Sequence, residues 1–188
     1  MIIATNNKGK IKEIKDILKI DSLYSLKDKN INIDVIEDMD TFEGNAIKKA
    51  KEIYEISKEA VIADDSGLCI SALDDFPGVL THRFLGEDAT DKQRNEYLIR
   101  EVDKHKNREA KVVCVLAYYD GKNTITAEGV LNGKISKKCR GTNGFGFDEI
   151  FETKEGLTLA ELTEKEKNKI SARALAAKEL KDKLKLIL

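Results

Sequence analysis

Apolar and polar residues follow each other along this chain in patterns that predict both helices and strands. A spacing of three to four residues between apolar positions is typical of a helix with one buried face, and short apolar runs or strict alternation are typical of strands. The expected helices cover residues 10–19, 42–58 and 91–103, and the expected strands cover residues 1–4, 31–36, 61–64, 109–119 and 122–131.

Polar residues at the ends of these elements predict how the elements begin and turn. Asp40 or Thr41 is expected to cap the second helix, and Asp40 has capping-box spacing to Glu43. Asp91 is expected to cap the third helix. Asp120-Gly121 predicts a tight hairpin between the last two strands.

A fourth, long helix is expected at the end of the chain, where Thr163 and Glu166 have the spacing of a capping box. Its apolar stripe would consist of Ile170, Ala174, Ala177, Leu184 and Ile187. Helices that alternate with strands early in the chain, followed by a hairpin, predict an α/β fold with a mixed sheet.

The composition indicates one globular domain over residues 1–188, located in the cytoplasm. Hydrophobic residues make up 41% and charged residues 36% of the chain, and no apolar run has the length of a signal peptide or a membrane span. The net charge of −1 produces no overall electrostatic attraction to nucleic acid or to a membrane surface, so neither is an expected partner. Cys69, Cys114 and Cys139 lack metal-ligand spacing and are expected to be free thiols in a reducing compartment.

Carboxylates are concentrated where the buried strand over residues 61–64 is expected to end. Asp64 and Asp65 are followed by Ser66 and Gly67, which predicts that the strand delivers two adjacent negative charges to a turn. Buried charge requires a cation, a proton or a polar ligand nearby. A solvated acidic turn is the alternative interpretation of this stretch alone.

Glu37 and Asp38 follow the expected strand over residues 31–36 in the same way. Carboxylates from two neighbouring strand ends predict a Mg²⁺ site, because Mg²⁺ takes one or two protein carboxylates together with water and substrate phosphates. No cluster of His and Cys residues in the sequence suggests zinc instead.

A polar segment between the first strand and the first helix reads Thr5-Asn6-Asn7-Lys8-Gly9-Lys10. Backbone N–H groups at a helix start bind anions, Gly9 allows close approach, and the lysines add positive charge. This segment is a candidate phosphate-binding loop, and a solvated connector is the alternative.

A glycine-rich loop contains the segment Phe145-Gly146-Phe147-Asp148. Aromatic faces flanked by glycine can stack on a planar base while the carboxylate accepts hydrogen bonds from the base. The alternative is a hydrophobic loop that packs on the core, which is the role expected of Phe151.

Lys167 and Arg173 are candidate ligand-binding cations at the start of the terminal helix. Their separation of six residues places them about 120° apart around a continuous helix. A break near Ser171, which could cap a second helical segment, would let them converge on one ligand. A solvated basic face is the alternative.

Six segments of this chain, in the same order, resemble the inosine/xanthosine triphosphate pyrophosphatase family of house-cleaning nucleotide hydrolases. The segments are residues 4–10, 61–68, 77–79, 86–90, 144–148 and 160–167. The resemblance covers essentially the whole chain. It implies a two-lobed α/β fold with a long central mixed sheet flanked by helices, a cleft between the lobes, and a homodimer. It also implies Mg²⁺-dependent cleavage of non-canonical purine nucleoside triphosphates (ITP, dITP and XTP) to the monophosphate and pyrophosphate.

The resemblance further implies roles for individual residues. Asp65 and Lys10 would be catalytic, with Asp65 accepting the proton of the attacking water, and Glu37 and Asp65 would bind the metal. The substrate-binding residues would be Thr5, Asn6, Asn7, Lys8, Gly9, Lys10, Ser66, Phe145, Gly146, Phe147, Asp148, Lys167 and Arg173.

The chain departs from the family pattern at three places. The family has a base-contacting His where this chain has Ala172, whereas His82 stands where the family usually has Ala. Gly44 replaces a Glu at the start of the second helix, which weakens a helix by about 1 kcal/mol relative to Ala. The missing imidazole leaves open an alternative function, a nucleotide-binding protein with weak turnover or relaxed base specificity.

Overall fold

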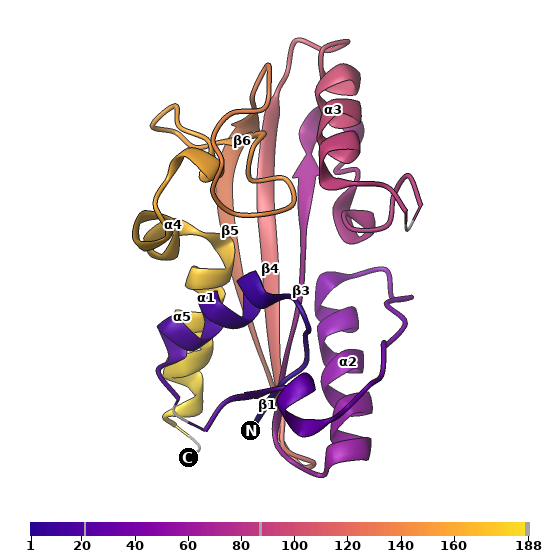
Figure 1. Ribbon diagram of the computed structural model, residues 1–188, viewed down its shortest axis with the longest axis vertical. Coiled ribbons are helices and arrows are strands. Elements are labelled where there is room, and N and C mark those ends of the chain that lie inside the picture. The colour runs from indigo at the N-terminus through magenta and orange to yellow at the C-terminus, as the bar shows by residue number, and fades with distance from the viewer. Residues whose placement is uncertain (21, 87, 187–188) are drawn as a thin grey trace. The chain divides into compact units, whose positions relative to one another are not determined.

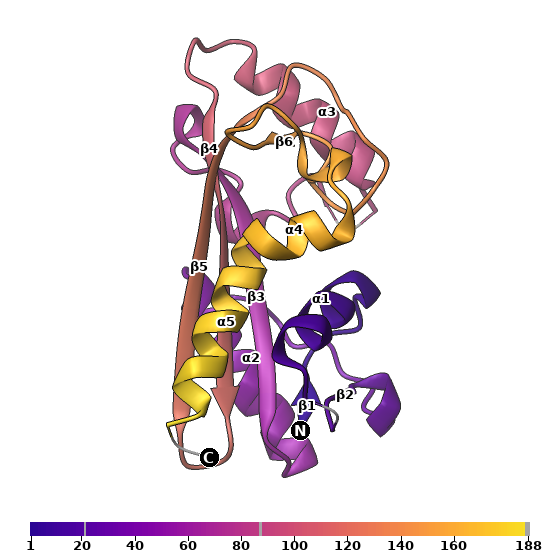
Figure 2. The same cartoon turned by 90° about the vertical axis from the view of Figure 1, so that its left-hand side faces the viewer.

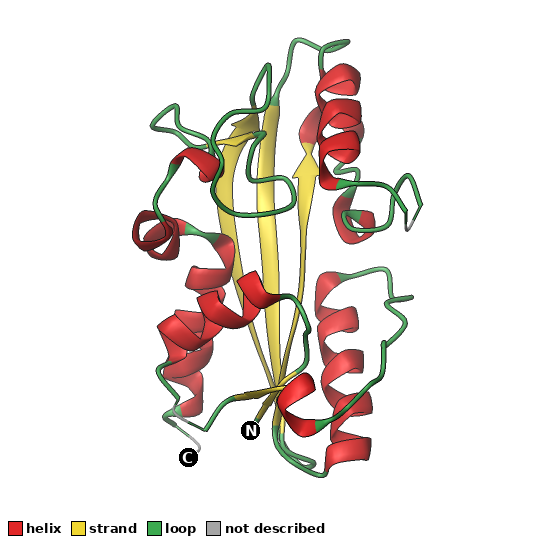
Figure 3. Cartoon of the chain, in the orientation of Figure 1, coloured by secondary structure: helices red, strands yellow, loops and turns green. Residues whose placement is uncertain are grey.

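The structure, a computed structural model, describes residues 1–20, 22–86 and 88–186. Within these residues, six strands form one mixed sheet in the order β2-β1-β3-β4-β5-β6, flanked by five α-helices (Figures 1 and 3). The strands are β1 (Ile2–Ile3), β2 (Tyr24–Ser25), β3 (Val61–Ile70), β4 (Glu109–Tyr119), β5 (Thr124–Ile135) and β6 (Phe151–Glu152). The helices are α1 (Lys8–Leu18), α2 (Phe42–Ser57), α3 (Asp91–Val102), α4 (Glu164–Ile170) and α5 (Ala172–Leu184). The predicted α/β fold with a mixed sheet is confirmed.

The chain divides into two compact units. Unit 1 comprises residues 1–66, residues 114–129 and the chain from Ala172 onward, and unit 2 comprises residues 67–113 and 130–171. The divisions fall inside β3, β4 and β5, so both units take part of their framework from the same three strands.

In unit 1, β1 lies between β2 and β3 and is parallel to both. Helix α1 packs against α5, as Figures 1 and 2 both show. The apolar stripe of α1 supplies Ile14 and Leu18 to the core, and α5 supplies Ala177 and Leu180. Burial of these stripes holds the two helices together, since isolated helices of this length are marginal in water.

Helix α1 begins two residues earlier than the sequence pattern predicts. Asn7 is its N-cap, and the Asn7 side-chain oxygen accepts hydrogen bonds from the backbone N–H groups of Gly9 (2.9 Å) and Lys10 (3.2 Å). An N-cap asparagine satisfies amides that have no partner within the helix. Lys8, Gly9 and Lys10 therefore belong to the first turn of the helix rather than to the preceding loop.

The strand expected over residues 31–36 is wrong, because the structure has no regular secondary structure there. The alternation that suggested a strand is visible in the exposure of the side chains: Val35 is buried, whereas Asn32, Asp34 and Ile36 are exposed. Among the described residues this segment joins no strand ladder. Alternation of buried and exposed residues indicates an extended segment with one buried face. It does not show whether another strand lies beside that segment to pair with it.

Helix α2 is capped by Thr41, one of the two expected residues. Its hydroxyl accepts a hydrogen bond from the backbone N–H of Gly44 at 3.0 Å. A Cβ at Gly44 would lie 3.0 Å from both the Thr41 hydroxyl and the Met39 Cβ. A larger residue at this position would therefore require Met39 or Thr41 to shift by a few tenths of an ångström.

In unit 2, α3 begins at Asp91, but its N-cap is Thr90 rather than Asp91. Thr90 and Gln93 form a capping box, with each side chain bonded to the backbone of the other residue. The sequence pattern misplaced the cap by one residue because Thr and Asp are both favoured N-caps. The buried residues Leu98 and Val102 attach the helix to the core of this unit.

The expected terminal helix is two helices, separated at Ser171. The capping box of Thr163 and Glu166 is confirmed at the start of α4. Ser171 leaves the helical conformation, with φ −59° and ψ 149°, and α5 follows directly. Lys167 belongs to unit 2 and Arg173 to unit 1. Ile187 of the expected apolar stripe, and Glu87 of the family-like segment 86–90, lie outside the described residues.

The paired strands expected around Asp120-Gly121 are confirmed. β4 has the predicted bounds, and β5 begins at Thr124 and extends to Ile135. The Asp120 carboxylate accepts hydrogen bonds from the backbone N–H groups of Lys122 (2.9 Å) and Asn123 (2.6 Å), which closes the connection.

Candidate active site

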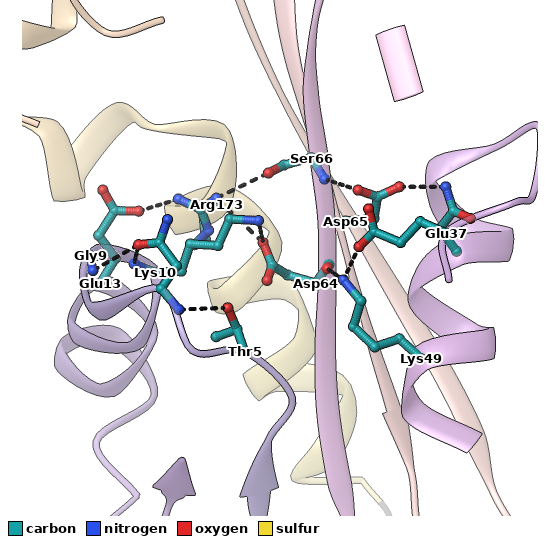
Figure 4. A network of polar contacts seen from close by, with 12 residues as sticks. Thr5, Gly9, Lys10, Glu13, Glu37, Lys49, Asp64, Asp65, Ser66 and Arg173 are labelled. Atoms are coloured by element: carbon teal, nitrogen blue, oxygen red, sulfur yellow. Dashed lines mark hydrogen bonds and ion pairs between the residues drawn. The ribbon is translucent and has the colours of Figure 1, made fainter. Parts of the chain in front are cut away.

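Strand β3 carries three consecutive buried polar residues in its interior. Asp64, Asp65 and Ser66 are 1%, 2% and 5% exposed, and the strand continues through them to Ile70. The prediction that the two aspartates stand at a turn is therefore wrong. Neighbouring side chains of a strand point to opposite faces of the sheet. Asp64 and Ser66 accordingly face α1 and α5, whereas Asp65 faces α2 (Figure 4).

The Asp64 carboxylate lies between two buried cations. Its Oδ2 is 3.1 Å from Lys10 Nζ and 3.4 Å from Arg173 Nη2. Burial disfavours the charged carboxylate, but Lys10 and Arg173 outweigh it and hold the pKa of Asp64 well below its usual range. Asp64 is therefore a fixed anion that cannot act as a proton acceptor near neutral pH.

Arg173 is held by residues from two other elements. Its Nη2 donates a hydrogen bond to the Ser66 hydroxyl at 3.1 Å, and its Nη1 donates to the Glu13 carboxylate on α1. Burial opposes the charge of Arg173, but the nearby anions, Asp64 first, raise its pKa above its ordinary value. Lys10, Asp64, Arg173 and Glu13 thus form a buried cluster of alternating charge, which we call the β3 ion cluster.

Sequence analysis missed Glu13, which is only 4% exposed. The available signal was its position: Glu13 lies three residues after Lys10, on the same side of α1, and next to the buried Ile14. A carboxylate at the edge of an apolar stripe is mostly solvated, so the signal is weak without knowledge of its partner.

Asp65 has a different environment on the other face of β3. Its two oxygens accept hydrogen bonds from Asn45 Nδ2 and the backbone N–H of Ser66, both at 2.9 Å. Burial and the negative charge of Glu37 raise the pKa of Asp65 from 3.8 to about 6. A carboxylate with a pKa near the working pH can accept and release a proton, which is the property of a general base.

Glu37 and Asp65 could hold a divalent metal. Burial would lower the pKa of Lys49, but Asp64 and Glu37 raise it above the ordinary value. Lys49, on α2, donates hydrogen bonds to the Glu37 carboxylate and to the backbone oxygen of Asp64, the latter at 3.0 Å. Among the described residues, no three His, Cys, Asp or Glu side chains are grouped closely enough to form a metal site without other ligands. Two carboxylates fit Mg²⁺, which completes its shell with water and phosphate oxygens.

Lys49 is a second residue that sequence analysis missed. From α2, its side chain connects the Glu37 carboxylate to the backbone oxygen of Asp64 on β3 (Figure 4). The helix contains five other lysines or glutamates between residues 43 and 55, so no pattern singles out this one.

The candidate phosphate loop has both exposed and buried members. Asn6, Asn7 and Lys8 are exposed, whereas Lys10 is 8% exposed and belongs to the β3 ion cluster. Thr5 Oγ1 accepts a hydrogen bond from the backbone N–H of Asn7 at 3.2 Å. Asn6 and Lys8 line an open groove of about 670 Å³ together with Ser25, Lys27, Asn30 and Asn32. The amides of Gly9 and Lys10 are already occupied by the Asn7 side chain.

In unit 2, the loop that contains Phe145 to Asp148 is closed by a buried ion pair. Asp148 Oδ2 accepts hydrogen bonds from Lys167 Nζ at 2.7 Å and from the backbone N–H of Phe145 at 2.9 Å. Lys167 Nζ also lies 4.5 Å from the centroid of the Phe145 ring, at the distance of a cation–π contact. A Cβ at Gly144 would lie 2.1 Å from Asp148 Oδ2, so this closure requires glycine.

The other residues singled out by sequence lie as follows. Phe151 is fully buried, which confirms its expected core role. Ala172 is the first residue of α5 and is 2% exposed. His82 is exposed and borders a small cavity in unit 2 that Asn95 and Phe147 also line. Cys69, Cys114 and Cys139 are free thiols, as predicted.

Comparisons with known proteins agree on one family over nearly the whole chain. Residues 1–183 match the Ham1 family. The chain is 45% identical to the dITP/XTP pyrophosphatase of Clostridium perfringens, covering 100% of this chain and 98% of that protein. It is 43% identical to the dITP/XTP pyrophosphatase of Bacillus subtilis, covering 95% and 93%.

Solved structures give the same result for the fold. The Ham1 protein of Staphylococcus aureus has a TM-score of 0.89 and 34% identity, with 98% of this chain and 97% of that chain covered. A Ham1 protein from Coxiella burnetii has a TM-score of 0.89 and 33% identity, with 98% of each chain covered. No helix in the described residues is long and apolar enough to cross a membrane.

Proposed function

The chain belongs to the Ham1 family, and from this premise we propose that it is a Mg²⁺-dependent nucleoside triphosphate pyrophosphohydrolase. The substrates would be non-canonical purine nucleoside triphosphates (ITP, dITP and XTP), released as the monophosphate and pyrophosphate. The names of the relatives as dITP/XTP pyrophosphatases support this substrate class. One observation of the structure carries the proposal: the buried Asp65, held by Asn45 on one face of β3, directly follows Asp64, which lies between the buried cations Lys10 and Arg173 on the other face.

We infer that Glu37 and Asp65 hold the metal. Their oxygens are the hard ligands that Mg²⁺ prefers, and the charge of Glu37 already raises the pKa of Asp65. A bound Mg²⁺ would offset the negative charge of the phosphate oxygens. Lys49, which donates to Glu37 here, would keep that carboxylate near Asp65.

Asp65 and Lys10 would have distinct catalytic roles. Asp65 would take the proton of the attacking water, because its raised pKa allows proton transfer near neutral pH. Lys10 would bind the outer phosphates, where cleavage of a phosphoanhydride depends on positioning and charge neutralisation. Asp64 would hold Lys10 in place through the ion pair at 3.1 Å.

The remaining site residues would bind substrate. Thr5 to Lys10 would bind the phosphates, with the exposed Asn6, Asn7 and Lys8 reaching the ligand first. Ser66 and Arg173, which are hydrogen-bonded to each other, would contact the substrate from the β3 ion cluster. In unit 2, Phe145 to Asp148 and Lys167 would recognise the purine base.

The whole chain of 188 residues would act as one enzymatic domain. We propose that it works in the cytoplasm as a homodimer and binds neither nucleic acid nor membranes. The near-zero net charge supports the last point, because nonspecific binding to nucleic acid depends on positive charge. Light scattering coupled to gel filtration measures the dimer, and oligonucleotide titration at low salt tests for nucleic acid binding.

The decisive experiment is a panel of nucleotides scored by released pyrophosphate. We expect turnover of ITP, dITP and XTP with Mg²⁺, loss of turnover on chelation and recovery when Mg²⁺ is added back. Asp65→Asn should reduce turnover far more than substrate binding. Asp182→Asn, on an exposed carboxylate of α5, is the matched control. If Asp65→Asn keeps full turnover, the assignment of the proton acceptor is wrong.

The same panel separates the alternative function. A nucleotide-binding protein with weak turnover would bind ITP in calorimetry but release no pyrophosphate above the rate of Asp65→Asn. Buried Ala172, in place of the family His, is the observation that keeps this alternative open.

A further inference from the structure

Two side chains of helix α3 form hydrogen bonds with the backbone N–H and the backbone oxygen of one residue in the glycine-rich loop. Asp91 Oδ2 accepts a hydrogen bond from the backbone N–H of Gly146, and Asn95 Nδ2 donates one to the backbone oxygen of Gly146, both at 2.9 Å. Asp91 and Asn95 are four residues apart, so they lie on the same face of the helix. We call these two side chains and Gly146 the α3 clamp.

The two sides of the α3 clamp differ in their environment. Asn95 is 2% exposed, whereas Asp91 is largely exposed. Loss of the part-buried Asn95 bond would remove this partner of the Gly146 backbone oxygen, which costs more than loss of the exposed bond to Asp91. The structure therefore makes Asn95 the dominant side of the clamp.

The clamped residue occupies a critical position in the loop. Gly146 has φ +63° and separates Phe145 from Phe147. A Cβ at Gly146 would meet no atom within 4 Å, so the positive φ rather than lack of space favours glycine here, and the two hydrogen bonds to α3 hold its backbone groups. Rotation of the Gly146 peptide would change the orientation of both aromatic rings.

Helix α3 is itself anchored next to the clamp. Arg94 is buried, and its guanidinium donates to the backbone oxygens of Phe84 (3.1 Å), Gly86 (2.7 Å) and Ala89 (2.5 Å). These three bonds tie the backbone of Phe84, Gly86 and Ala89 to α3. The clamp residues therefore stand on a helix that is anchored beside them, as positioning of a binding loop requires.

We propose that Asp91 and Asn95 are positioning residues that set the orientation of Phe145 and Phe147 and thereby determine purine binding and selectivity. This inference rests on the proposed function, in which the loop recognises the base. Neither residue needs to touch the substrate, since both act through the Gly146 peptide.

The test compares variants that break each bond with variants that preserve it. Asn95→Ala removes the donor, and Asp91→Ala removes the acceptor. Asp91→Asn keeps an acceptor oxygen but not the charge, so it separates the hydrogen bond from the charge at the start of the helix. Glu96→Gln, on an exposed neighbour in α3, is the matched control.

Two measurements are needed for each variant. Hydrogen exchange of the 144–148 backbone, without nucleotide, measures whether the clamp holds the loop. Steady-state hydrolysis of ITP and ATP measures binding and selectivity. We expect faster exchange in Asn95→Ala and Asp91→Ala, with an increase of about three- to tenfold in KM for ITP, a lower ITP-over-ATP ratio of kcat/KM and little change in kcat. Asp91→Asn and Glu96→Gln should resemble the wild type.

Other outcomes overturn the inference in separate ways. Unchanged exchange in Asn95→Ala means that the clamp does not hold the loop. Faster exchange with unchanged KM and unchanged selectivity means that loop position does not govern base binding. A uniform loss of kcat for both nucleotides, together with a lower melting temperature, indicates a structural role only. Wild-type protein without turnover of any nucleotide refutes the proposed function instead, before any variant is compared.

Discussion

Asp65 should make the metal-free protein less stable as the pH rises, and this effect can be isolated. Its pKa is about 6 in the folded protein, against 3.8 as the ordinary value, because burial and Glu37 disfavour its charged form. Between these pH values the folded state binds more protons than the unfolded state. Asp65 therefore costs nothing below about pH 4, and its cost is complete once the pH has risen through 6.

The magnitude follows from the pKa difference. The folded and ordinary values differ by about 2, and each pKa unit corresponds to about 1.4 kcal/mol, so the full cost is about 3 kcal/mol. This is a large fraction of the free energy of unfolding of a typical domain, about 5–15 kcal/mol. Asp65→Asn removes the titrating group and hence the pH-dependent part of the cost.

Denaturant unfolding of wild type and Asp65→Asn in the presence of a chelator, at several pH values from 4 to 7.5, measures this effect. The substitution places a side-chain amide near the Asn45 donor, which adds a constant difference between the two proteins. The quantity of interest is therefore the change in that difference with pH. We expect the variant to gain about 3 kcal/mol relative to the wild type across this range. A difference that stays constant with pH would refute the reasoning.

Three further predictions concern the phosphates, the base and the core. Lys10→Ala should weaken ITP binding by about 1.5–3 kcal/mol, as expected for a charge-assisted hydrogen bond, and weaken IMP binding less; equal losses in calorimetry would place Lys10 away from the outer phosphates. Ala172→His should raise the ITP-over-ATP ratio of kcat/KM. If both Ala172→His and His82→Ala fold and neither changes this ratio, the base is recognised by the loop from Phe145 to Asp148. Gly129→Ala should lower the midpoint of denaturant unfolding, since its Cβ would lie 2.0 Å from the Ala172 backbone oxygen and overpacking typically costs about 1–3 kcal/mol; an unchanged midpoint would contradict that packing.

Much of the fold was predictable because local patterns determine it. The stripe of α1, the long strands β4 and β5, and the capping box at Thr163 were all recognised from spacing that involves neighbours in sequence. Residues 31–36 show the limit of this approach. Their alternation is real, but a strand also needs a partner, and the pairing of distant segments is not encoded in a local period.

The candidate site shows the same limit in its chemistry. The carboxylates on β3 were recognisable because two adjacent aspartates after an apolar run are conspicuous. Their opposite environments were not recognisable, since Asp64 depends on Lys10 and Arg173, which approach it from two helices at opposite ends of the chain. Glu13 was overlooked for the same reason, because its role appears only when Arg173 is beside it.

The position of Asp64 and Asp65 inside a strand has a consequence for how this protein can evolve. Their different properties depend on odd and even positions along β3, because consecutive side chains alternate between faces. Insertion or deletion of one residue between Val61, which pairs with β1, and Asp64 would exchange the two faces: Asp65 would turn toward the face of Arg173 and Asp64 toward the face of Asn45, so each carboxylate would lose the environment that sets its pKa. Single substitutions leave this parity intact, so β3 should tolerate changes of residue type at Ile62 and Ala63 far better than a change of length by one residue.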